Sequence, residues 1–139
     1  MIVVSDASPL IALSGLGRLE LLRDLYGDVM VPEEVFREVA DDPLFRPGSA
    51  ELRASDWIIV RTIQRDDMAR TLAGIMDKGE AEAVALALQA KADLLLIDER
   101  RARFAAERLG LKVVGVLGSW ARQSGAALFR RPRLCFTTL

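Results

Sequence analysis

Short apolar segments alternate with helical patterns along this chain of 139 residues. Each segment is rich in Val, Ile or Leu and only a few residues long, which is typical of strands covered on both faces. Alternation of this kind favours an α/β fold, with a central, mainly parallel sheet of four or five strands between two layers of helices. The predicted strands are residues 2–5, 28–31, 57–60, 93–97 and 112–114.

Helical patterns fill the intervals between these strands. Ser8 and Pro9 predict the start of a first helix, with Ser8 as its N-cap and Pro9 at its first position. The Pro47-Gly48 pair predicts a break before a helix at 49–54. The other predicted helices are residues 18–25, 32–39, 66–76, 80–90, 100–109 and 117–123.

The absence of histidine and the single cysteine exclude several classes of catalytic and metal site. The chain has no histidine, which excludes histidine general bases, Ser-His triads and His-ligated zinc. Its one cysteine, Cys135, excludes an intramolecular disulfide and fits a reducing compartment. No segment approaches the roughly 18 uninterrupted apolar residues of a membrane span. We therefore expect a cytoplasmic protein. The formal net charge of −1 indicates nothing for or against nucleic acid.

Four acidic residues stand out by position. Asp6 and Asp98 each follow an apolar strand, so both are expected at the carboxyl edge of a parallel sheet, where such folds bind ligands. Glu38 lies late in the helix after the second strand, and Glu80 begins an apolar helix. Clustered carboxylates repel one another unless a cation lies among them. Without His or Cys, the fitting cation is Mg²⁺ or Mn²⁺.

Each acid also has a purely structural explanation. Asp6 and Asp98 are both suited to capping a following helix, and Glu80 is favourable at any helix start. Glu38 could belong to an exposed helical face. Glu82 lies about 200° around the helix from Glu80 and is expected to face away from the cluster. The combination of the four in this order is more specific than any one of them.

Three stretches resemble the PIN-domain superfamily: DASPLIAL, VPEEVFREV and GEAEAVALALQAKADLLLIDERRARFAAERLGLKVVG. The resemblance is to the PIN-like branch of predicted nucleic-acid-binding proteins related to the ribonuclease toxins of toxin–antitoxin pairs (VapC type). It covers residues 1–125, which it implies are a three-layer α/β/α nuclease domain, with 126–139 as a C-terminal tail. It further implies a metal-dependent endoribonuclease that cuts single-stranded RNA, and an antitoxin protein as partner.

The resemblance also implies roles for individual residues. Asp6, Glu38, Glu80 and Asp98 match the catalytic acids of the family. Asp6, Glu80 and Asp98 would bind Mg²⁺ or Mn²⁺, and Ser8 matches a hydroxyl residue near the first acid. The chain departs from the family in having Glu80 where Asp is more usual, and in lacking Thr or Ser near the last acid.

Basic residues next to the last acid suggest how RNA would be held. Arg100 and Arg103 share a helix face, and we expect them, with Ser8, to bind substrate. The alternative is a solvated face paired with Glu99 and Glu107.

Two other functions compete with a nuclease. A phosphoacceptor receiver domain would need a second acid close to Asp6 and a lysine at the end of a late strand, and the sequence has neither. A catalytically inactive PIN-like module that binds nucleic acid or protein remains open. The short helices are expected to leave Leu25 and Phe36 exposed, which favours a homodimer.

Overall fold

A computed structural model describes residues 1–41 and 46–115 of the chain. The predicted helix at 117–123 and the tail at 126–139 lie outside the described residues. Five parallel strands form one sheet in the order β3-β2-β1-β4-β5. The strands are β1 (Val3–Ser5), β2 (Val29–Pro32), β3 (Ile58–Arg61), β4 (Leu94–Leu96) and β5 (Val113–Val114). The predicted α/β class and parallel sheet are confirmed.

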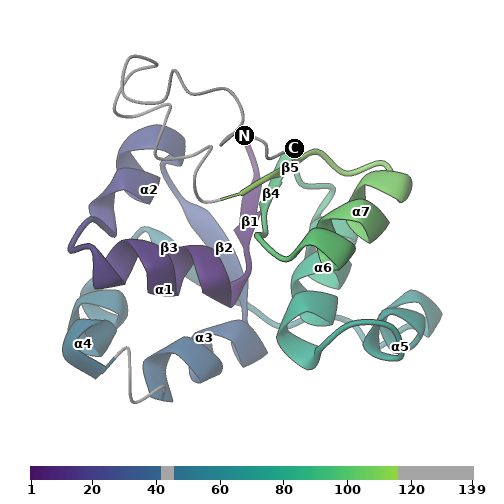
Figure 1. Cartoon of the computed structure of the whole chain (residues 1–139), viewed down its shortest axis with the longest axis horizontal. Coiled ribbons are helices and arrows are strands. Elements are labelled where there is room, and N and C mark those ends of the chain that lie inside the picture. Colours follow the sequence, from purple (N-terminus) through teal and green to yellow (C-terminus); the bar gives the residue numbers. More distant parts are fainter. Residues whose placement is uncertain (42–45, 116–139) are drawn as a thin grey trace.

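Helices cover both faces of the sheet (Figure 1). One layer is built from α1 (Ala7–Gly15), α2 (Glu20–Tyr26), α3 (Glu33–Asp41) and α4 (Arg46–Ala54). The other is built from α5 (Asp67–Ala73), α6 (Lys78–Ala90) and α7 (Arg100–Arg108). The molecule is thus a three-layer α/β/α fold, as predicted.

Strand residues alternate between two apolar cores. Val3, Leu94 and Leu96 pack with the α1–α4 layer, whereas Val4 and Leu95 pack with the α5–α7 layer. Successive side chains of a strand point to opposite faces, so a strand that is apolar throughout serves both cores. This explains why the central strands carry no polar–apolar alternation.

The predicted starts of the first helix and of the helix after Pro47-Gly48 were wrong. The N-cap of α1 is Asp6, and Pro9 is the third residue of the helix. Helix α4 begins at Arg46, so Pro47 falls in its first turn and the Pro47-Gly48 pair makes no break. Proline is tolerated in both places because the first-turn amides have no partner within the helix.

The predicted exposure of Leu25 and Phe36 was also wrong. Both are partly buried and pack against the core of the α1–α4 layer. The large apolar side chains most exposed within the described ranges include Leu16, Ile75 and Phe104. No helix among the described residues is long and apolar enough to cross a membrane.

Candidate active site

The sheet order creates a crevice between β1 and β4. Strand β1 is followed by α1 in one layer, whereas β4 is followed by α7 in the other. Parallel sheets bind ligands where neighbouring connections leave in opposite directions, outside the carboxyl ends of the strands. Asp6 directly follows β1, and its amide donates a hydrogen bond to the Leu96 carbonyl oxygen at 2.9 Å. The first acid therefore lies at this crevice.

Asp6 is a buried carboxyl group. It is only 3% exposed, and burial is the main reason that its pKa rises from an ordinary 3.8 to about 7. A hydrogen bond from the Ala7 amide lowers the pKa, while the charges of Glu80, Asp77 and Glu38 raise it. The structure thus brings the charges of Glu38 and Glu80 to bear on Asp6, as expected for a shared site.

Glu80 lies in the first turn of α6 and takes part in its cap. Oδ1 of Asp77 accepts from the Glu80 amide at 2.8 Å, and Oε1 of Glu80 accepts from the Asp77 amide at 3.4 Å. This reciprocal capping box explains why α6 begins at Lys78. Burial, followed by the charge of Asp77, raises the pKa of Glu80, and the hydrogen bond from Asp77 opposes the rise. The charges of Glu99 and Glu38 add smaller increases.

Glu38 reaches the site from α3 across the start of α6. A Cβ atom at Gly79 would lie 2.8 Å from Oε1 of Glu38 and 3.8 Å from Oδ1 of Asp6. The carboxylates of Glu38 and Asp6 therefore both lie close to Gly79, which has no side chain. Helices α3 and α6 pack against each other and both adjoin β2, which brings a late residue of one to the first turn of the other.

Asp98 lies two residues after β4, at the same edge, beside an arginine. A Cβ atom at Gly115 would lie 3.0 Å from Oδ1 of Asp98 and 3.4 Å from Nη1 of Arg103. Asp98 does not cap α7, because Glu99 is the N-cap and accepts from the Ala102 amide at 2.9 Å. The structural explanation of Asp98 as a helix cap is therefore wrong.

The residues expected to bind substrate differ in exposure. Ser8 and Arg100 are exposed, whereas Arg103 is half-buried. The Nε atom of Arg103 is buried and has no hydrogen-bond partner in the described part of the chain.

Sequence reasoning missed Asp77 and Gly79. Asp77 raises the pKa values of both Asp6 and Glu80 through its charge. The spacing of Asp77 and Glu80 is that of a capping box, a signal that could have drawn attention to Asp77. The proximity of Gly79 to Glu38 has no comparable signal, because it depends on how α3 packs on α6.

Glu82 faces a different part of the molecule. It is 4% exposed, and its Oε2 lies 2.7 Å from Nη2 of Arg65. The pair borders a cavity of about 310 Å³ between α5 and α6, whose lining residues are Ile63, Arg65, Ala69, Ala73, Lys78, Ala81 and Glu82. The ion pair with Arg65 therefore gives the buried Glu82 carboxylate a partner within the domain.

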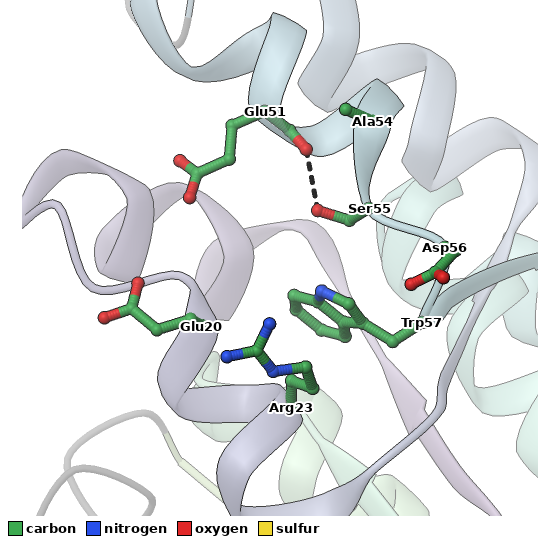
Figure 2. Close-up of a pocket in the computed structure, with 7 residues that line it drawn as sticks. All are labelled: Glu20, Arg23, Glu51, Ala54, Ser55, Asp56 and Trp57. Atoms are coloured by element: carbon green, nitrogen blue, oxygen red, sulfur yellow. Dashed lines mark hydrogen bonds between the residues drawn. The ribbon is translucent and has the colours of Figure 1, made fainter.

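Another cavity, of about 260 Å³, lies at the amino ends of the strands. Its lining comes from α2, the end of α4 and the residues that lead into β3 (Figure 2). The hydroxyl of Ser55 donates to the Glu51 carbonyl oxygen at 2.6 Å within it. Because these residues precede the strands, this cavity lies at the opposite edge of the sheet from Asp6.

The acids fit a hard divalent cation in their chemistry. All candidate donors are carboxylate oxygens, which Mg²⁺ and Mn²⁺ prefer. Burial and like charges destabilise ionised Asp6, and a bound cation would relieve this cost. Within residues 1–41 and 46–115, however, no three acidic, His or Cys side chains lie close enough to hold a metal ion. The carboxylates would have to turn toward one another to do so.

Comparison with known proteins adds a family and a fold. A family model described as a PIN domain matches residues 2–125. A PilT N-terminus domain protein from the hyperthermophilic archaeon Sulfolobus solfataricus P2 has a similar structure, with a TM-score of 0.65 and 17% identity. The similarity covers 88% of this chain and 93% of the archaeal one, and at this identity it shows the fold alone. No curated protein matches the sequence.

Proposed function

The chain belongs to the PIN-domain family, whose members are generally nucleases, and we propose that it is a metal-dependent endoribonuclease that hydrolyses phosphodiester bonds of single-stranded RNA. The observation that carries the proposal is the buried carboxyl group of Asp6 at the β1–β4 crevice, with a raised pKa. The charges of Glu80 and Glu38 both act on it. Buried, mutually repelling acids at such a crevice are typical of functional sites.

In this proposal Asp6, Glu80 and Asp98 bind the metal. A divalent cation, when bound, lowers the pKa of a water molecule and neutralises charge on the phosphate oxygens. Glu38 orients the attacking water or binds a second cation. Oε1 of Glu80 accepts a long hydrogen bond from the Asp77 amide, at 3.4 Å, for which a cation would compete.

Substrate binding is assigned to residues beside the acids. Ser8 is exposed in the first turn of α1, and Arg100 is exposed in the first turn of α7. Both are available to phosphate groups of an RNA strand that crosses the β1–β4 crevice. Arg103 is half-buried near Gly115, as Asp98 is, and would add positive charge to the site.

The biological setting that we propose is the toxin of a toxin–antitoxin pair in the cytoplasm. An antitoxin protein would be the partner, and a homodimer the working form.

Exposed Ile75 and Phe104 belong to the α5–α7 layer and are candidates for the dimer contact. Light scattering at micromolar concentration should give the mass of two chains for wild type. The double variant Ile75→Glu, Phe104→Glu should give the mass of one chain. Leu16→Glu, on the other layer, is the matched control and should leave the dimer intact.

The second candidate is a catalytically inactive PIN-like module that binds nucleic acid or protein. The observation that favours it is that Oδ1 of Asp98 and Nη1 of Arg103 both lie near Gly115, which brings a positive charge into the neighbourhood of one of the acids. In this alternative the acids serve structure and RNA is held without being cut.

An RNA cleavage assay separates the two candidates. Purified protein should cut a panel of single-stranded RNAs with Mg²⁺ or Mn²⁺, and EDTA or Asp6→Asn should stop the reaction. Protein that binds RNA but leaves the whole panel intact with either metal would establish the inactive module instead.

A further inference from the structure

Gly79 occupies a crowded position at the start of α6. It is buried, and a Cβ atom there would lie 2.8 Å from Oε1 of Glu38. Side-chain carbons do not approach an oxygen this closely without a shift. Every other residue at position 79 would therefore force either Glu38 or the start of α6 to move.

The cheaper of these two movements is that of Glu38. Its carboxylate is the far end of a flexible side chain on a residue that is exposed overall. The other atoms near such a Cβ are Cγ2 of Val35 at 3.7 Å and Oδ1 of Asp6 at 3.8 Å, which are ordinary contact distances. An added methyl group would displace the Glu38 carboxylate and leave the packing of α6 in place.

We propose that Gly79 is a positioning residue: because it has no side chain, the Glu38 carboxylate can lie beside Asp6 at the first turn of α6. This inference rests on the proposed function, since Glu38 and Asp6 are two of its acids. Alanine is a better helix former than glycine, so helix stability does not account for glycine at this position.

The test is a double-mutant cycle between Gly79→Ala and Glu38→Asp, read first by Mn²⁺ affinity. The Glu38 charge acts on the metal ligand Asp6, so displacing the Glu38 carboxylate removes negative charge from beside the bound cation. Residues that support metal ligands typically change affinity by about 10- to 100-fold, and we expect Gly79→Ala to weaken Mn²⁺ binding within this range. Aspartate at position 38 is one methylene shorter and clears the methyl group. Gly79→Ala should therefore cost less affinity when Glu38→Asp is present.

Gly15→Ala is the matched control. Gly15 is also helical, and a Cβ there would meet nothing within 4 Å. This variant should bind Mn²⁺ as wild type does. Equal Mn²⁺ affinity for Gly79→Ala and wild type would overturn the inference, as would an equal loss of affinity in both backgrounds.

Melting temperatures of the four proteins of the cycle in EDTA give a second readout that needs no metal. Gly79→Ala should raise the melting temperature more in the Glu38→Asp background than in wild type, because only the longer Glu38 side chain has to move away from the added methyl group. An equal change in both backgrounds, or a large fall in both, would mean that Gly79 serves packing alone. Wild type that binds no Mn²⁺ would contradict the proposed function instead, and the EDTA cycle would still decide the role of Gly79.

Discussion

The amide of Asp6 donates a hydrogen bond to the carbonyl oxygen of Leu96, 2.9 Å away. This bond joins the end of β1 to the end of β4, so the acid that follows one strand is fixed relative to the acid that follows the other. The backbone of the sheet therefore sets the distance between the Cα atoms of Asp6 and Asp98.

Replacing either of these acids by its amide should abolish RNA cleavage. The loss should exceed the roughly 10- to 100-fold typical of residues that only support a metal ligand. Asn matches Asp in shape and is about as good an N-cap residue, so both variants should fold. Glu33→Gln is the control, because Glu33 is an exposed acid of α3 that forms a surface ion pair with Arg37. Cleavage by Asp6→Asn at the wild-type rate would remove Asp6 from the site.

The stability of the metal-free protein should fall as the pH rises from about 4 to about 7. In this range the folded protein keeps a proton on Asp6, whose pKa is about 7, while the unfolded chain has lost it near 3.8. The state with more bound protons is disfavoured as pH rises, by at most about 1.4 kcal/mol per pH unit for one group. Urea unfolding in EDTA at several pH values measures this slope.

Asp6→Asn is the control for that slope. Wild type should become progressively less stable than Asp6→Asn as the pH rises from about 4, and the difference in unfolding free energy should level off above pH 7. Two parallel curves would show that Asp6 titrates normally. Mn²⁺ affinity should rise over the same range, because a metal ligand must first lose its proton.

Two variants of Asp77 separate its two effects. Asp77→Ala removes the acceptor of the Glu80 amide and should cost about 1 kcal/mol of stability. Asp77→Asn keeps a good cap and removes only the charge of Asp77. Because that charge raises the pKa of Asp6, its removal should lower this pKa. This variant should leave stability nearly unchanged and move the pH at which the Asp6 effect ends to a lower value. An unchanged pH would mean that the Asp77 charge does not reach Asp6.

The ion pair between the buried Glu82 and the exposed Arg65 should respond asymmetrically to mutation. The Glu82 side chain is 6% exposed and that of Arg65 is 64% exposed. Arg65→Ala leaves a buried carboxylate without its partner and should cost on the order of 1–3 kcal/mol. Glu82→Gln keeps the shape without the charge and should cost less. Urea unfolding compares the two, and a larger cost for Glu82→Gln would contradict the burial argument. RNA cleavage should survive Glu82→Gln, because Glu82 faces Arg65 and not Asp6.

The strands, and the acids that follow β1 and β4, were predictable because they depend on local sequence patterns. Apolar runs such as that before Asp98 are typical of central parallel strands, and acids that follow such strands are expected at the same edge of the sheet. The start of α6 at Lys78 was missed because a capping box decides it, and the start of α1 because Asp6, one of the acids, occupies the cap. The approach of Asp98 and Arg103 to Gly115 was not predictable, since it depends on contacts between α7 and β5.

The central position of β1 also has a consequence for synthesis of the chain. Val3 pairs with Leu94, and the Ile2 amide donates to a carboxylate oxygen of Asp93, 91 residues later in sequence. Contacts this distant form late, because the intervening chain must first be closed into a loop. A growing polypeptide on the ribosome holds Asp6 from the beginning but cannot place Asp98 beside it until β4 has emerged. The active centre of the proposed ribonuclease therefore cannot assemble near the translating ribosome and its messenger RNA before most of the domain has been made.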